Sequence, residues 1–309
     1  MNNSKIIFMG TPLISKEYLN SLIQNKIQIE AVFTQSPKKK SRGMQLTKSP
    51  VHIFANENNI NVFHPKNFDL EILSHLKKIK PDLIIVMAYG KILPKAVLQL
   101  PKYGCINVHV SILPRWRGAA PIEHALMNGD KESGISIIKL VEKLDSGPII
   151  AQEKLIIPEN YNRLQLTDKL TEIGTKLLVN TVPNILKNKI IIREQDEKDA
   201  TYANKINSEN RKINFNNSVK NIINHIRAHA PKPGAWFLLN KERIKIIDAK
   251  IGNSNGKNST ILNTNFEIGC EDGSIQPLIL QRQGRNIVAI EEFLRGYKIN
   301  LNDKINAEL

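Results

Sequence analysis

Short apolar segments alternate with helical patterns along the first part of the chain. Residues 6–9 and 83–88 are continuous apolar runs, which are typical of strands buried on both faces. Between these runs, residues 13–23, 50–56 and 69–78 carry apolar side chains at helical spacing. Strands that are apolar on both faces need a cover on both faces. The alternation therefore predicts a Rossmann-like α/β domain with a mostly parallel sheet and helices on each side.

The sequence pattern changes after residue 189. Residues 193–199 form a dense run of charges, and from residue 206 onward short apolar runs are separated by Gly, Asn and Asp. Short strands at this spacing are typical of a small β-rich domain. We therefore expect an α/β domain over residues 1–189, a linker over 190–205 and a smaller C-terminal β-barrel, similar to an OB-fold, over 206–309.

Composition limits the class of protein. The 309 residues are 41% hydrophobic, which is a core-forming composition. Cys105 and Cys270 are too few for a disulfide framework or a four-thiolate zinc site, so we expect a cytoplasmic protein. The seven histidines lack the spacing of a metal motif, so we expect no metal. The longest uncharged apolar run is too short to span a bilayer, and we expect no membrane association.

The formal charge of +15, with a pI near 9.7, has two possible origins. It fits a polyanionic partner such as nucleic acid. It also fits a composition rich in Lys, Ile and Asn that was never selected for binding. Because the cations are spread along the chain, charge alone leaves both interpretations open.

Residues 105–111 are the most informative segment, because polar or small side chains alternate strictly with β-branched ones. As a strand, the segment would place Asn107, His109 and Ser111 on one face. Ligands of open α/β sheets bind at the carboxyl ends of the strands, which makes these side chains active-site candidates. The alternative is a histidine that is hydrogen-bonded within the core, the commoner role of an isolated histidine.

Two turns and one basic loop complete the candidate set. Residues 112–121 have the pattern of a tight strand-to-helix turn, and residues 144–148 form a turn that contains Asp145. By itself, an Asp before Ser-Gly is only a turn former. Residues 34–43 combine turn residues with four cations and no apolar period, which predicts a basic loop.

Taken together, these segments resemble the methionyl-tRNA formyltransferase family of folate-dependent formyltransferases. The resemblance covers nearly the whole chain, and it implies transfer of a formyl group from 10-formyltetrahydrofolate to the α-amino group of methionine on initiator tRNA. The matching motifs are Gly10–Pro12, Ala88–Pro94, Asn107–His109, Ser111–Ile122, Leu144–Gly147, Arg227-Ala228, Pro231–Trp236, Gln281–Gly284 and Glu292–Gly296.

The resemblance implies catalytic roles for three residues. An amine that attacks an amide-like carbonyl needs a donor for the oxyanion and a group that manages the amine's proton. Asn107 would donate to the oxyanion. His109 would take the proton or, once protonated, stabilise the oxyanion, and Asp145 would orient the ring and favour the imidazolium. The first acceptor of the proton is either His109 or a bound water.

The resemblance also implies binding residues. The family's folate-contacting turn corresponds here to Ser111, Ile112, Leu113 and Pro114, and Tyr89 is a further folate candidate. The family inserts the loop after its second strand at the acceptor end of tRNA. That loop carries Lys38, Lys39, Lys40 and Arg42 here.

Arg42 is the most specific candidate in this loop, because a guanidinium can hold a phosphate or a base edge with paired hydrogen bonds. The loop departs from the family's usual Gln-Pro-Asp-Arg/Lys-Pro, since residues 35–39 are Gln-Ser-Pro-Lys-Lys. The family also implies a monomer.

Two other functions remain in view. One is a formyltransferase of the same fold that acts on a nucleotide-linked amino sugar, and the other is a non-catalytic tRNA-binding protein. The intact Asn107, His109 and Asp145 argue against loss of catalysis. The basic loop and the C-terminal motifs favour tRNA over a sugar nucleotide.

Overall fold

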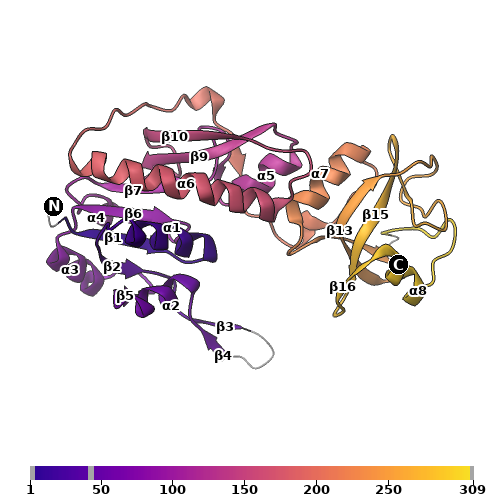
Figure 1. Ribbon diagram of the computed structural model, residues 1–309, viewed down its shortest axis with the longest axis horizontal. Helices are drawn as coiled ribbons and strands as arrows, with labels where there is room; N and C mark the ends of the chain where they lie inside the picture. The colour runs from indigo at the N-terminus through magenta and orange to yellow at the C-terminus, as the bar shows by residue number, and fades with distance from the viewer. Residues whose placement is uncertain (1–3, 41–44, 307–309) are drawn as a thin grey trace. The chain divides into compact units, whose positions relative to one another are not determined.

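The computed structural model describes residues 4–40 and 45–306, and the chain divides into two compact units (Figure 1). The first unit consists of Met1–Gly118, Ser133–Leu155 and Asp168–Tyr202. The second consists of Ala119–Glu132, Ile156–Thr167 and Ala203–Leu309. None of the helices over the described residues is long and apolar enough to cross a membrane.

Within the described residues, seven strands form the sheet of the first unit in the order β10-β9-β7-β6-β1-β2-β5. β1 pairs in parallel with β2 and β6, β6 with β7, and β2 with β5, whereas β9 runs antiparallel to β7. The predicted mostly parallel sheet is therefore confirmed. The strands are β1 (Ile6–Gly10), β2 (Ile29–Phe33), β5 (Asn61–Phe63), β6 (Leu83–Met87), β7 (Cys105–His109), β9 (Glu132–Lys139) and β10 (Ile149–Ile156).

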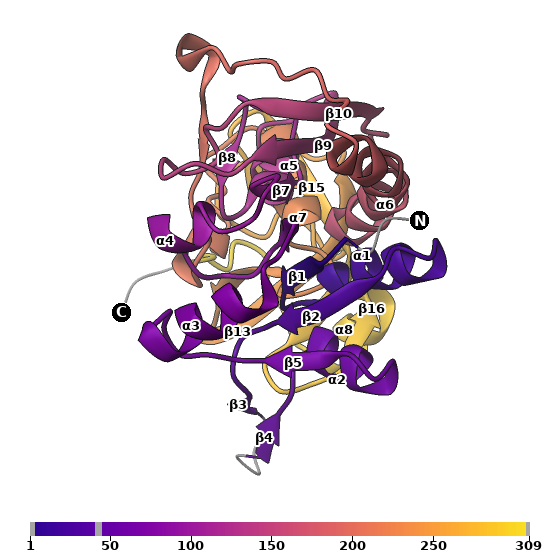
Figure 2. The ribbon, with the colours of Figure 1, turned by 90° about the vertical axis from the view of Figure 1, so that its left-hand side faces the viewer.

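Helices cover both faces of this sheet, as the sequence predicts. Figure 2 shows α3 (Leu70–Ile79) and α4 (Lys95–Leu98) on one face, with α1 (Leu13–Gln24), α2 (Pro50–Glu57) and α6 (Arg163–Leu186) on the other. Every residue of β1 and β6 is buried. Burial on both faces explains why these strands are continuous apolar runs.

Side-chain caps fix where two of these helices begin. The hydroxyl of Ser49 accepts a hydrogen bond from the N–H of His52 at the start of α2, and Pro50 follows at the first turn. The carboxylate of Asp69 accepts from the N–H of Ile72 at the start of α3. Such caps satisfy N–H groups that the helix itself leaves unpaired.

The basic segment after β2 is not a simple loop. Residues Lys38–Lys40 form β3, which pairs antiparallel with β4 (Gln45–Thr47) in a short two-stranded sheet. The prediction of a loop over residues 34–43 is therefore wrong for residues 38–40. Backbone hydrogen bonds hold such a hairpin together, so it leaves no apolar period in the sequence. Arg42 lies outside the described residues.

The second unit has an antiparallel sheet in the order β12-β13-β15-β14, with β16 also paired to β15. Its core gathers Phe215, Phe237, Phe266 and Phe293 with aliphatic side chains of the sheet and of α7. The predicted β-rich C-terminal part is thus confirmed. Its elements are β12 (Ala235–Leu239), β13 (Glu242–Ile251), β14 (Ile268–Cys270), β15 (Gly273–Arg282), β16 (Ile287–Ala289), α5 (Pro121–Met127), α7 (Val219–His229) and α8 (Ile290–Gly296).

Four short elements complete the description. They are β8 (Arg117–Gly118), β11 (Tyr202–Ala203), and the 3₁₀ turns η1 (Glu197–Asp199) and η2 (Glu209–Arg211). β8 follows the turn after β7, and η1 lies in the stretch that the sequence analysis assigns to a linker.

The contact between α6 and α1 predicts an unusual effect of a glycine substitution. A Cβ at Gly174 would meet the Tyr18 hydroxyl oxygen at 1.9 Å and a side-chain carbon of Ile135 at 3.0 Å. Gly174→Ala should therefore lower the free energy of unfolding by about 1–3 kcal/mol, although this change normally stabilises a helix. Urea unfolding of the purified variant measures the difference.

Gly296→Ala is the matched control, because a Cβ at the end of α8 would meet nothing within 4 Å. The variant Tyr18→Phe removes the oxygen that the new Cβ would meet. The hydroxyl of Tyr18 is buried without a hydrogen-bond partner among the described residues, so Tyr18→Phe alone should change the free energy of unfolding little. The double variant should regain part of the stability, and no recovery would contradict the proposed clash.

Candidate active site

Three residues predicted from sequence lie together in the first unit. Asn107 and His109 stand two apart on β7, and Asp145 comes from the turn between β9 and β10. The Nδ2 of Asn107 donates to Oδ1 of Asp145 over 3.3 Å, and Nδ1 of His109 lies 3.6 Å from Oδ2 of the same carboxylate. His109 is 5% exposed and Asp145 is 6% exposed. The structure therefore brings the predicted triad together, with His109 and Asp145 buried and Asn107 partly exposed.

Both ring nitrogens of His109 face oxygen acceptors. Nε2 lies 2.8 Å from the carbonyl oxygen of Trp116, and Nδ1 faces the Asp145 carboxylate. A neutral imidazole carries a proton on only one of its nitrogens, so it can donate to only one of these oxygens. Only the imidazolium donates to both. The ring therefore lies between an oxygen of the backbone and an oxygen of a carboxylate.

The carboxylate of Asp145 is oriented by a backbone donor as well as by side chains. The N–H of Gly118 donates to its Oδ2 over 2.9 Å, and the Asn107 amide donates to its Oδ1. Asp145 itself has a φ of +48°, in the left-handed region that Asp tolerates better than most residues. The turn conformation and the Gly118 donor thus fix the direction of the carboxylate.

The backbone at Trp116 is also held in an uncommon conformation. Its φ is +62°, which is costly for a bulky side chain. Its N–H donates to Oγ1 of Thr201 over 2.9 Å, and its ring stacks under the guanidinium of Arg115. These contacts hold the carbonyl that faces His109. Sequence reasoning missed this carbonyl and the Gly118 N–H, because backbone groups leave no side-chain signal.

The turn predicted to contact folate packs directly against β9. Ser111 and Leu113 are 2% and 1% exposed, while Ile112 and Pro114 are partly exposed. The hydroxyl of Ser136 donates to the Ser111 carbonyl and accepts from the Leu113 N–H. Each carbonyl of the turn already accepts a protein hydrogen bond, so the turn is rigid before any ligand binds.

Tyr89, the other folate candidate, has the surroundings of a core residue. It is 1% exposed, packs with the apolar side chains of β1, β6, α3 and α4, and contacts Phe68 edge to face. Burial raises the pKa of its hydroxyl to about 12, and the hydroxyl has no hydrogen-bond partner among the described residues. Its carbonyl accepts from Thr11 Oγ1 and Gln35 Nε2, which ties together the loops after β1, β2 and β6.

Of the four basic candidates, the structure gives side-chain detail for one. Lys38 is exposed, and its Nζ donates to Oε1 of Gln35 over 2.7 Å. Lys39 and Lys40 follow it on β3, with their backbones paired to Leu46 and Gln45. Arg42 is outside the described residues. Nowhere in residues 4–40 and 45–306 do three His, Cys, Asp or Glu side chains gather as a group that could hold a metal ion.

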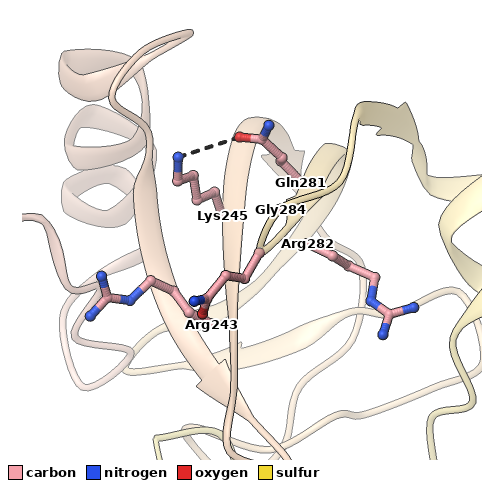
Figure 3. Close-up of a pocket in the computed structure, with 6 residues that line it drawn as sticks. Arg243, Lys245, Gln281, Arg282 and Gly284 are labelled. Carbon is pink, nitrogen blue, oxygen red and sulfur yellow. Dashed lines mark hydrogen bonds between the residues drawn. The ribbon is translucent and has the colours of Figure 1, made fainter. Parts of the chain in front are cut away.

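The second unit carries a basic pocket on the strands β13 and β15 (Figure 3). Lys245 Nζ donates to Oε1 of Gln281 over 3.3 Å, and the Arg243 guanidinium lies 3.9 Å from the centre of the Trp236 ring. Arg282 points away from Lys245 and forms a bidentate pair with Glu242. The lining residues are Arg243, Lys245, Gln281, Arg282, Gln283 and Gly284.

The electrostatics of this pocket suit an anion. Burial and the nearby charges of Arg211, Arg243 and Lys232 lower the pKa of Lys245. Neighbouring cations disfavour a further positive charge and would stabilise a negative one. Gln281–Gly284 is one of the C-terminal motifs of the sequence, whereas Arg243 and Lys245 carry no sequence signal that distinguishes them from the other cations of the chain.

Two family models match the chain. The model described as "Formyl transferase" matches residues 4–182, and the model described as "Formyl transferase, C-terminal domain" matches residues 205–298. The methionyl-tRNA formyltransferase of Pelagibacter ubique (strain HTCC1062) is 40% identical over 304 residues, which cover 97% of this chain and 98% of that protein.

Solved structures with the same fold include enzymes with two kinds of substrate. The N-formyltransferase from Helicobacter canadensis, in complex with folinic acid and dTDP-3-aminofucose, matches with a TM-score of 0.67 and 26% identity, covering 90% of this chain and 99% of that chain. The methionyl-tRNA formyltransferase from Clostridium thermocellum matches with a TM-score of 0.57 and 20% identity, covering 82% of this chain and 95% of that chain.

Proposed function

The chain belongs to the methionyl-tRNA formyltransferase family, and we propose that Asn107, His109 and Asp145 carry out its reaction. The protein transfers a formyl group from 10-formyltetrahydrofolate to the α-amino group of methionine on initiator tRNA, in the cytoplasm. The observation that carries this assignment is the cluster in which the partly exposed Asn107 amide meets the buried His109 imidazole and Asp145 carboxylate. Formyl transfer to an amine needs an oxyanion donor and a proton carrier, and this cluster offers both.

Asn107 is suited to the oxyanion because one of its N–H bonds remains available. Its Nδ2 carries two hydrogens, and among the described residues one of them is used, in the bond to Asp145. That bond fixes the amide in one orientation. The second hydrogen can then stabilise the negative charge that develops on the formyl oxygen, at no cost in reorganisation.

His109 manages the proton of the attacking amine. The amine nitrogen bonds to the formyl carbon and gives up a proton to His109, the bond from that carbon to N10 breaks, and the imidazolium returns the proton to N10, directly or through water, to give tetrahydrofolate. His109 accepts the amine's proton directly or through a bound water, and the imidazolium then donates to the Trp116 carbonyl and forms an ion pair with the Asp145 carboxylate. Asp145 holds the ring and balances the charge that forms on it.

The turn Ser111–Pro114 would contact the folate through its partly exposed members, Ile112 and Pro114. A flat heterocycle needs an apolar surface that keeps its shape, and the hydrogen bonds of this turn to Ser136 and Gln152 support such rigidity. Buried Ser111 and Leu113 would shape the turn from beneath. For Tyr89, whose side chain is in the core, the contribution would come through its carbonyl, which links the adjoining loops.

The basic hairpin and the C-terminal pocket would contact the tRNA. Lys38, Lys39 and Lys40 lie on β3 of the two-stranded sheet after β2, which suits insertion beside an acceptor stem, and Arg42 follows them in the sequence. The pocket around Arg243 and Lys245 combines positive charge with hydrogen-bonding amides, which suits a phosphate of the RNA backbone. The charge of +15 would then serve binding at two places.

A second candidate substrate is a nucleotide-linked amino sugar, because the Helicobacter canadensis enzyme shares the fold and is described with such a ligand. The basic hairpin and the 40% identity to the methionyl-tRNA formyltransferase of Pelagibacter ubique favour tRNA. Formyl transfer to methionyl initiator tRNA, measured beside transfer to dTDP-amino sugars, separates the two. Activity on the sugars alone would overturn the tRNA assignment.

The triad yields the first functional prediction. Asn107→Ala, His109→Ala and Asp145→Asn should each lower kcat by at least about 10²-fold, as expected for the loss of an oxyanion donor or an acid–base group. Folate binding and thermal unfolding should change little. Glu142→Gln is the control, because this carboxylate lies in the same turn and is exposed in a pair with Lys95. Near-normal turnover of His109→Ala would exclude the mechanism.

The C-terminal pocket predicts a position-specific salt effect. Lys245→Ala should weaken tRNA binding and reduce the slope of log K against log salt by about one, as for one lost phosphate contact. Lys250→Ala is the control, since this lysine is exposed on the same strand outside the pocket. Equal effects of the two changes would indicate general electrostatics and no pocket.

The hairpin predicts a change in tRNA preference. Arg42→Ala should lower the ratio of kcat/KM for initiator over elongator methionyl-tRNA, because a guanidinium can read a base edge as well as a phosphate. Lys38→Ala should weaken the binding of initiator and elongator methionyl-tRNA to the same extent. Measurement of kcat/KM on both tRNAs at two salt concentrations tests this, and an unchanged ratio for Arg42→Ala would leave the hairpin a purely electrostatic role.

A further inference from the structure

Arg117, directly after the active-site turn, is a fully buried charge. Its side chain is 0% exposed, although arginine is rarely buried without a partner. Its Nε and Nη2 both donate to Oε1 of Gln195, over 3.1 and 2.9 Å, and its Nη1 donates to both carboxylate oxygens of Glu197. The guanidinium therefore holds two side chains of residues 190–205, the predicted linker.

Gln195 passes this contact on to the catalytic turn. Its Nε2 donates to the carbonyl oxygens of Asp145 and Gly147, over 2.8 and 2.7 Å. A glutamine amide can do this because one end accepts from Arg117 while the other end donates. The arginine fixes which way the amide points, so the N–H groups face the turn.

The turn that Gln195 holds is conformationally demanding. Asp145 has a φ of +48°, and Gly147 lies so close to the strand before it that a Cβ would meet the Lys139 carbonyl oxygen at 1.8 Å. A turn of this kind persists only when its surroundings determine it. Both hydrogen bonds from Gln195 are made to this turn, on each side of Ser146.

We propose that Gln195 is a positioning residue for catalysis, held by the buried Arg117, and that it sets the direction of the Asp145 carboxylate. The backbone of Asp145 is fixed by Gln195, and its carboxylate reaches His109 and the Gly118 N–H from that backbone. Arg117 and Gly118 are adjacent, so the same short strand β8 supports the turn from two sides. The inference rests on the proposed function of Asp145.

Residue 195 must therefore both accept hydrogen bonds from Arg117 and donate them to the turn, which glutamine can do and glutamate cannot. Glutamate would keep the acceptor for Arg117 but would place an oxygen where the amide donates, facing two carbonyl oxygens. Glutamate also matches glutamine in size. Gln195→Glu thus removes the support of the turn while it preserves the contact to the arginine, whereas Gln195→Ala removes both contacts.

The test is steady-state kinetics of the full-length Gln195→Glu protein with methionyl initiator tRNA and 10-formyltetrahydrofolate. We expect kcat to fall about 10-fold to 10²-fold, because small displacements of catalytic groups have effects of this size. KM for both substrates should change less than about 2-fold, since the hydrogen bonds of the Gln195 side chain go to Arg117 and to the turn. Gln99→Glu, which adds the same charge at an exposed site of the first unit, is the control and should leave kcat unchanged.

A double-mutant cycle with Asp145→Asn identifies the route of the effect. If Gln195 acts through Asp145, then adding Gln195→Glu to Asp145→Asn should lower kcat by less than about 2-fold further. If Gln195→Glu lowers kcat by the same factor in the wild-type protein and in Asp145→Asn, the proposal is overturned. An unchanged kcat in Gln195→Glu alone would also overturn it. If Gln195→Glu unfolds, Gln195→Ala serves in the same cycle, with thermal unfolding recorded for each variant.

The two hypotheses fail in different ways. A normal kcat for Asp145→Asn alone would contradict the proposed function, and with it the basis of the cycle. A large loss of kcat in Asp145→Asn, together with a normal kcat in Gln195→Glu, would leave the catalytic role of Asp145 intact and would exclude a positioning role for Gln195. A fall in unfolding temperature with kcat unchanged would show that Gln195 serves only stability.

Discussion

The pairing of β7 with parallel β6 on one side and antiparallel β9 on the other is the constraint on which the active site depends. The parallel side places Asn107 and His109 near the carboxyl end of a buried strand, where open sheets bind their ligands. The antiparallel side returns the chain across the sheet. Ser136 lies on β9 and forms hydrogen bonds to the turn after β7. The turn that follows β9 contains Asp145.

Buried polar groups are expensive unless they are paired, and this site pairs nearly all of its own. His109, Asp145 and Arg117 are each at most 6% exposed, and each has hydrogen-bond or ionic partners close by. Besides the contacts within the triad, the partners are the Trp116 carbonyl and the Gly118 N–H for His109 and Asp145, and the side chains of Gln195 and Glu197 for Arg117. Such a network is rigid, because displacing one member leaves another buried group unsatisfied. Rigidity is what stabilisation of a developing charge requires.

Much of the fold could be predicted because its physical cause is local. The apolar runs at β1 and β6 reflect burial on both faces, and the amphipathic helices reflect burial on one. The hairpin at Lys38–Lys40 could not be predicted in this way, since backbone pairing between exposed strands imposes no side-chain pattern. Tyr89 shows the opposite case. Its position after β6 suggested a ligand contact, but the packing of helices α3 and α4 encloses its side chain.

The sequence by itself determined the chemical groups of the site. The alternation around β7 put Asn107 and His109 on one face, and the family motifs added Asp145. Only the tertiary structure decided how those groups are held, because their supports are the Trp116 carbonyl, the Gly118 N–H and Gln195. Backbone groups are the same in every residue, and Gln195 lies 50 residues from Asp145 in a charged segment without periodicity. Contacts between groups so distant in sequence exist only once the chain has folded.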